Sequence, residues 1–266
     1  MGAMKRAIGA TVMGGSIALG LARGRRPALR VTRHRVAWPE LSAPRTVAQL
    51  SDLHVGWSTP EVLFREVLAA LEAEPPDLVA LTGDYVNVSR VFLRRLERFV
   101  AALPAPVVAV LGNHDHIAGA EQIGRALESG GAQVLRNRRL TMLGLEIVGV
   151  DDGRTRHQDV NLAFAGVEGP SLVLTHYPPT ALEVLGRGAR LVLTGHTHAG
   201  QLDLPHGLTE RLTRFVGHGG FLRGRYALEG GTELYVNAGL GHSRPGMRRG
   251  EPCRPELAYF RLDPDE

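Results

Sequence analysis

The stretch Val107-Val-Ala-Val-Leu-Gly-Asn-His-Asp-His116 changes character halfway along its length. Its first half is a short β-branched apolar run, typical of a buried strand, and Gly112 ends that run. An amide, an imidazole and a carboxylate follow at once. The pattern predicts a strand with polar chemistry at its carboxyl end, although on its own it fits a strand followed by an Asn-rich turn equally well.

The same construction occurs four more times in the chain. Four other short apolar runs end in Asp or His: Val47–Leu50 before Asp52 and His54, Leu78–Leu81 before Asp84, Leu172–Leu174 before His176, and Leu191–Leu193 before His196 and His198. In open α/β sheets, ligands bind outside the carboxyl ends of the strands. We therefore expect the five polar clusters to converge on one site.

The composition is that of an ordinary globular protein. The chain has 266 residues, of which 44% are hydrophobic and 22% charged, enough for one large domain with a sizeable core. The single cysteine, Cys253, excludes a disulfide framework and a thiolate metal site, so a metal would take nitrogen and oxygen ligands. The net charge of +4 permits an anionic partner, but the excess is modest and we do not expect nucleic acid.

Residues 1–44 are predicted to be a leader and a linker. Basic residues flank the small-residue apolar run Ala7–Ala22 on both sides. The run is shorter than the roughly 20 apolar residues of a spanning helix, and the arginines after it oppose export as a signal sequence. We favour an interfacial anchor through residues 5–26, which makes the protein peripheral to the cytoplasmic face of a membrane. The alternatives are a disordered leader on a soluble cytoplasmic protein, or an exported protein.

The compact domain is expected to span residues 45–266 and to be α/β with mixed sheets, because strand–helix alternation gives way to strand-rich segments. Thr59-Pro60-Glu61 has the cap, proline and acid of a helix start. Further helices are expected over Arg90–Leu103, Ala120–Glu128 and Asp159–Val167. Strands are expected over Leu29–Val36 (in the linker), Leu140–Met142, Leu145–Val150, Gln201–Leu204, Leu234–Val236 and Leu257–Leu262, with a Gly- and Arg-rich loop over Pro205–Arg225.

The side chains expected to converge are carboxylates, imidazoles and one amide: Asp52, His54, Asp84, Asn113, His114, His176, His196 and His198. They are too many for a single catalytic ion, which keeps about three protein ligands. They fit two divalent ions about 3.5–4 Å apart that share a bridging carboxylate. Such ligands are compatible with Mn, Fe, Zn or Mg and do not choose between them; we take Mn as the favoured ion.

Each motif has a structural explanation when taken alone. The Asp52-x-His54 pair occurs by chance, and Gly83-Asp84 is typical of a turn. Two features favour ligands: alternation on a strand places Asp52 and His54 on one face, and His196 and His198 on an extended segment can point at one site. Five independent coincidences at strand ends would be needed to explain the whole set structurally. We therefore favour a dinuclear metal site.

Taken in their order along the chain, the polar motifs resemble the complete motif set of the calcineurin-like metallophosphoesterases. The matching motifs are Asp52-x-His54, Gly83-Asp84, Gly112-Asn113-His114-Asp115, His176 and Gly195-His196-x-His198. The resemblance implies a four-layer αββα sandwich of two mixed β-sheets. It also implies a first metal held by Asp52, His54 and His198, a second held by Asn113, His176 and His196, and a bridge through Asp84. His114 would contact the phosphate and assist the leaving group, oriented by Asp115.

Less specific motifs outside this set resemble one branch of the family. They are Val31-Thr32-Arg33-His34, Gly149-Val150-Asp151-Asp152, Ala199-Gly200-Gln201 and Arg254-Pro255-Glu256. The branch includes membrane-associated bacterial enzymes, some of which cleave the pyrophosphate of UDP-2,3-diacylglucosamine in lipid A synthesis. Asp84 is followed by Tyr85-Val86-Asn87, where the branch often carries a further acid, so the resemblance does not extend to the details of the pocket.

The resemblance and the ligand set together predict a dinuclear metal-dependent hydrolase of phosphoester or pyrophosphate bonds. A metal-bound hydroxide would attack phosphorus directly, since no side-chain nucleophile is offered. A lipid-linked, amphiphilic phosphoester leads as substrate, and a nucleotide or nucleic-acid phosphodiester is the alternative. A non-catalytic metal-binding scaffold is the rival of a different class, and His114 argues against it because a scaffold needs no acid.

Overall fold

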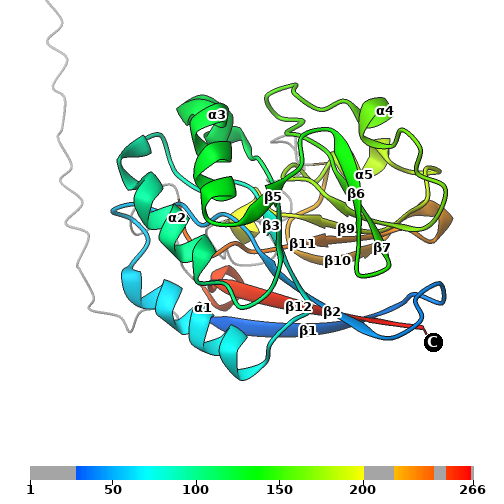
Figure 1. Cartoon of the computed structure of the whole chain (residues 1–266), viewed down its shortest axis with the longest axis horizontal. Coiled ribbons are helices and arrows are strands. Elements are labelled where there is room, and N and C mark those ends of the chain that lie inside the picture. The colour runs from blue at the N-terminus through cyan, green and yellow to red at the C-terminus, as the bar shows by residue number, and fades with distance from the viewer. Residues whose placement is uncertain (1–27, 201–218, 243–249, 265–266) are drawn as a thin grey trace, which may run out of the picture.

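Two mixed sheets of six strands each form the centre of the computed structural model (Figure 1), which describes residues 28–200, 219–242 and 250–264. The first sheet has, in spatial order, β1 (Arg30–Ala37), β12 (Glu256–Asp263), β2 (Arg45–Leu50), β3 (Leu78–Thr82), β4 (Val107–Val110) and β5 (Ala132–Val134). The second has β10 (Gly224–Ala227), β11 (Glu233–Val236), β9 (Ala189–Thr194), β8 (Ser171–Leu174), β7 (Leu145–Gly149) and β6 (Arg138–Met142). The predicted α/β fold with two mixed sheets is confirmed.

Each sheet contains four consecutive parallel strands. Strands β2, β3, β4 and β5 run parallel in the first sheet, as do β7, β8, β9 and β11 in the second. Antiparallel strands lie outside these runs, with β12 on β2, β6 on β7 and β10 on β11. The parallel strands that precede the predicted polar clusters therefore end at the same edge of their sheet, where ligands of α/β folds bind.

Strand β3 shows why these strands read as continuous apolar runs. Leu78 and Ala80 belong to the core between the two sheets, whereas Val79 and Leu81 belong to the core under the helices of the first sheet. Successive side chains point to opposite faces of a strand, and both faces are covered here. A strand buried on both faces needs apolar residues at every position.

Helices α1 (Glu61–Ala73), α2 (Leu93–Ala101) and α3 (Asn113–Ser129) cover the outer face of the first sheet (Figure 1). The short helices α4 (Val160–Ala163) and α5 (Thr180–Glu183) pack on the outer face of the second. The helix predicted from Thr59-Pro60-Glu61 is present, but its N-cap is Pro60 and not Thr59, whose hydroxyl instead donates to the carbonyl of His54 at 2.9 Å. A 3₁₀ turn, η1 (Arg90–Phe92), precedes α2. Among the described residues, no helix has the length and apolar character needed to cross a bilayer.

Helix α3 begins at Asn113 and not at Ala120, where the apolar pattern starts. Gly112 is its N-cap, and the Asp115 carboxylate accepts the Gly112 N–H at 2.8 Å, which is one half of a capping box, because glycine has no side chain to supply the other half. The first turn is polar because it serves the site, so apolar periodicity does not reveal it. Gly119, with φ of 125°, kinks the helix between this turn and the predicted segment.

The extended piece expected in the linker is an integral edge strand. Strand β1 pairs in parallel with β12 along its whole length, so the first sheet begins before Arg45. Two short strands were not predicted: β5, and β10, which begins in the last two residues of the expected loop Pro205–Arg225 and continues beyond it. The predicted leader at residues 1–27 and the predicted strand Gln201–Leu204 lie outside the described residues.

Candidate metal centre

The loops after β2, β3, β4, β8 and β9 bring the predicted side chains together at one edge of the two sheets. Two groups of possible metal ligands result: Asp52, His54 and His198, and Asp84, His176 and His196. Within each group the candidate ligand atoms lie within 4.8 Å of one another. The predicted convergence of the five strand ends is thus what the structure shows.

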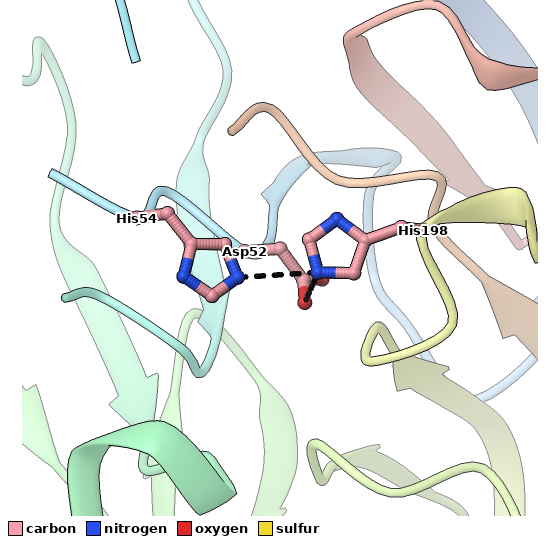
Figure 2. Close-up of side chains that lie close together, drawn as sticks. All are labelled: Asp52, His54 and His198. Atoms are coloured by element: carbon pink, nitrogen blue, oxygen red, sulfur yellow. Dashed lines mark hydrogen bonds and ion pairs between the residues drawn. The ribbon is translucent and has the colours of Figure 1, made fainter. Parts of the chain in front are cut away.

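The first cluster consists of one carboxylate between two imidazole rings. In Figure 2 the rings of His54 and His198 turn one nitrogen edge toward each other. These two Nε2 atoms lie 3.1 Å apart. The His198 Nε2 atom also lies 3.2 Å from Oδ1 of Asp52. All three residues are buried, so these nitrogen and oxygen atoms point at one small volume away from bulk solvent.

The second cluster lies beside the first, and the first turn of α3 contacts its carboxylate through the backbone N–H of His114. His196 Nδ1 lies 3.2 Å from His176 Nε2, and His176 Nε2 lies 3.2 Å from Oδ2 of Asp84. Asn113, the first residue of α3, is buried, and its Oδ1 atom accepts no hydrogen bond among the described residues. A buried carbonyl oxygen without a donor is costly, and a cation in this cluster would satisfy it.

Asp84 faces both clusters through a single oxygen. Its Oδ1 atom accepts the backbone N–H of His114 at 2.9 Å. Its Oδ2 atom lies 3.2 Å from His176 Nε2 in the second cluster and 3.8 Å from His54 Nε2 in the first. Since the N–H of α3 fixes one oxygen, the other is left between the two clusters, which is the position of a bridging ligand.

Backbone carbonyls fix which ring nitrogens face the clusters. His176 donates from Nδ1 to the carbonyl of Thr82 at 2.8 Å, and His198 from Nδ1 to the carbonyl of Gly241 at 3.2 Å. In its neutral form each ring then directs its Nε2 lone pair into the site, as is usual for metal-binding histidines. Buried donors of this kind, all nitrogen and oxygen, fit divalent cations.

The electrostatics favour a positive charge beside Asp84. Burial and the adjacent His198 lower the pKa of His54 to about 3, which leaves a neutral ring. Burial alone would raise the pKa of Asp84, but the charge and hydrogen bond of His176 hold it below its usual value. Burial conversely acts to lower the pKa of His176, and Asp84 nevertheless holds it well above its ordinary value. The Asp84 carboxylate thus stabilises a positive charge on His176, and it can stabilise a metal cation at the same place.

Left-handed backbone, and not alternation along extended strands, brings the side chains of the site together. Asp52 and His54 lie beyond the end of β2, and their φ angles are 51° and 43°. His196 and His198 have φ of 73° and 50° and belong to different clusters. The interpretation that these pairs alternate on extended strands is therefore wrong. Left-handed backbone, which is rare for residues with a Cβ, aims them, and such strained positions cluster at functional sites.

Two glycines leave room for the ligands. A Cβ at Gly239, whose φ is 76°, would lie 2.7 Å from the Cβ of Asp52, and a Cβ at Gly195 would collide with the same carboxylate. Gly195 belongs to the predicted motif, but Gly239 was not singled out. Its signal was the predicted strand Leu234–Val236: this strand, β11, is a parallel neighbour of β9 and ends at the same edge.

The interpretation that Asp115 orients His114 is wrong. The Asp115 carboxylate accepts three backbone N–H groups, from Asp84, Tyr85 and Gly112, at 2.8–2.9 Å. The Nδ1 atom of His114 pairs with the backbone carbonyl of Asn87 at 2.8 Å. Asp115 therefore positions the backbone that carries Asp84, and no sequence signal marks a carbonyl such as that of Asn87.

Residues 45–200 match the family model of the calcineurin-like phosphoesterases, which is more than half of the chain. The chain belongs to this family. Family membership makes it a metal-dependent phosphoester hydrolase.

Two bacterial relatives illustrate the similarity in sequence. Phosphodiesterase YaeI of Escherichia coli is 32% identical and aligns with 86% of this chain and 87% of its own. UDP-2,3-diacylglucosamine pyrophosphatase LpxG of Chlamydia trachomatis is 27% identical, over 88% of this chain and 89% of its own. Among solved structures, a dimetal phosphatase from Danio rerio has the same fold, with a TM-score of 0.51 at 12% identity, covering 85% of this chain and 94% of its own.

Proposed function

We propose that the chain hydrolyses phosphoester or pyrophosphate bonds with two divalent ions. Asp52, His54 and His198 would hold one ion and Asn113, His176 and His196 the other, with Asp84 as the bridge. The observation that carries this proposal is Oδ2 of Asp84, which faces both clusters. When bound, such an ion pair binds phosphate oxygens, activates water near neutral pH and offsets the charge of the leaving group.

The chain itself would supply a proton donor through His114. This residue is the second of α3, and its ring lies 5.1 Å from the ring of His54. The carbonyl of Asn87 occupies Nδ1, so Nε2 is the atom available to substrate. A ring held in this way can give its proton to the oxygen that leaves phosphorus. His114 also favours an enzyme over a metal-binding scaffold, because a scaffold would need no proton donor.

As substrate we propose an amphiphilic, lipid-linked phosphoester or pyrophosphate. The support is the name of the relative LpxG, together with the outer motifs of the sequence. The name of YaeI, a phosphodiesterase, favours a soluble diester such as a nucleotide as the second candidate. Turnover of UDP-acylated sugars, lipid phosphates, cyclic nucleotides and single-stranded DNA, measured side by side, separates the two.

The first expected result concerns metal dependence. Purified protein loaded with Mn²⁺ should hydrolyse an aryl phosphodiester, lose activity on chelation and regain it when Mn²⁺ is restored, because the clusters supply all the ligands that such ions need. The measurement is release of nitrophenolate beside metal content by elemental analysis. A metal-replete preparation that turns over neither monoesters nor diesters would support the scaffold instead.

A second expected result concerns the leader, which we propose as a membrane anchor. Deleting residues 1–27 should lower the fraction of the protein bound to membranes and leave hydrolysis of a soluble ester unchanged. The deletion stops before Ala28 because its carbonyl accepts a hydrogen bond from Arg254 at 3.0 Å. Sedimentation of both forms with vesicles is the measurement. Equal partition of the two forms would contradict the anchor.

A further inference from the structure

Exposed apolar side chains gather beside the candidate metal centre. Of the six large hydrophobic side chains that are exposed among the described residues, four lie on the segments that carry the site. We call these four the apolar rim: Trp57, Val88, Val91 and Ile117. Trp57 is 92% exposed and Val91 81%, so they protrude from the surface and do not line a groove.

The rim residues lie close in sequence to the candidate metal ligands. Trp57 lies three residues after His54, and Val88 lies four residues after Asp84. Ile117 lies in the first turns of α3, just beyond His114. The rim residues therefore share their loops with the candidate ligands.

Contacts between these segments make the rim one surface. The Trp57 ring packs edge-on against Phe92 at 5.3 Å, next to Val91. Asn87 links its neighbours on both sides: its Nδ2 donates to Ser58 Oγ at 3.2 Å, and its carbonyl pairs with His114 Nδ1 at 2.8 Å. The rim is thus fixed relative to the metal centre, although its side chains face solvent.

Positive charge flanks the rim. Arg90 in η1 and Arg94 and Arg98 in α2 are exposed, and none of them forms an ion pair within the described part of the chain. Protruding Trp and aliphatic side chains next to unpaired arginines are the pattern of surfaces that lie in a membrane interface. Arginine is attracted to anionic headgroups there.

We propose that the apolar rim docks on an anionic lipid bilayer, which turns the metal centre toward the membrane surface. The proposal goes beyond the proposed reaction, because docking and hydrolysis are separate measurements. It also differs from anchoring by the leader, which would tether the protein without fixing which face meets the lipid.

The two tryptophans of the chain provide a direct test. Trp38 is 1% exposed in the core between the sheets, and Trp57 is the protruding rim residue. On mixing the full-length protein with phosphatidylcholine–phosphatidylglycerol vesicles, we expect emission to shift to shorter wavelength and to be quenched by lipids with brominated acyl chains. Trp57→Ser should abolish both effects, since Trp38 cannot reach the lipid. A protein that sediments with the vesicles while Trp57 stays unshifted and unquenched would overturn the proposal.

A matched pair of variants tests the rest of the rim. Val88→Ser, Val91→Ser and Ile117→Ser combined should weaken Trp57 quenching and lower partition into the vesicles by about tenfold or more, because binding scales with the apolar area buried. Leu162→Ser with Leu182→Ser removes two exposed side chains from α4 and α5, on the opposite outer layer, and should change neither. Added salt should weaken binding, because it screens the arginines.

The soluble aryl diester separates this proposal from the reaction. The triple rim variant should hydrolyse it at the parental rate, since no rim residue is a candidate ligand or acid. If the rim and control variants lose partition equally, or neither loses any, the rim is not the docking surface. If the parent protein does not hydrolyse the diester, that result counts against the proposed function and leaves the docking proposal untouched.

Discussion

Asp84→Asn is expected to lower both metal content and activity, the latter by about 10³-fold or more, since a metal ion contributes several kcal/mol to stabilising the transition state. Both carboxylate oxygens of Asp84 must act as acceptors or ligands. Oδ1 takes the N–H of His114 at 2.9 Å, and Oδ2 faces the imidazoles of both clusters. An amide offers one acceptor and one donor group. In one orientation its NH₂ group would point at the ions, and in the other at the N–H of α3.

The measurement for Asp84→Asn is metal per protein by elemental analysis beside the rate on an aryl diester. Asp159→Asn is the matched control: Asp159 caps α4 by accepting the Leu162 N–H at 2.9 Å, and asparagine caps helices as well as aspartate does. The control should keep two metals and the parental rate. An Asp84→Asn protein that also keeps both would show that the bridge is assigned to the wrong residue.

The α/β fold and the convergence of the site residues could be predicted because the sequence shows where the buried strands run and where they end. Apolar runs such as Leu78–Leu81 reveal strands that are covered on both faces, and the polar residues after them must lie at the ligand-binding edge. Strands β5 and β10 have the sequences Ala-Gln-Val and Gly-Arg-Tyr-Ala, which are not apolar runs because part of each strand is exposed, whereas the equally short β4 is buried at every position. Strand β1 shows its extended character in the sequence, but its pairing with β12 depends on a segment more than two hundred residues away.

The local geometry of the site could not be predicted by the same reasoning. Asp52 and His198 converge through left-handed backbone, which periodicity does not report. Asp115 stands next to His114 in the sequence, yet its carboxylate turns to backbone N–H groups of two segments, including that of Asp84. Only the three-dimensional placement of the β3 loop against α3 distinguishes a residue that touches the ring from one that positions its neighbours.

His114→Ala should leave the metals in place and slow the reaction. The contact that fixes Asp84 comes from the backbone N–H of His114, which alanine retains, so metal content should stay near two per chain. The lost ring removes a proton donor, and general acid catalysis is typically worth 10²–10⁴-fold, or about 3–5 kcal/mol of barrier. His157→Ala is the control, because His157 is an exposed ring stacked on His116 outside the two clusters.

Leaving-group dependence then shows whether His114 acts as an acid. Nitrophenolate leaves readily without a proton, whereas an alkoxide does not, so the His114→Ala rate should fall less for an aryl diester than for an alkyl diester. The measurement is the ratio of the two rates in the parent and the variant, with metal content determined on the same samples. A variant that loses one metal outright would make His114 a ligand. Parental rates on both esters would make it a bystander. An equal fall on both, with two metals retained, would restrict its role to holding the phosphate.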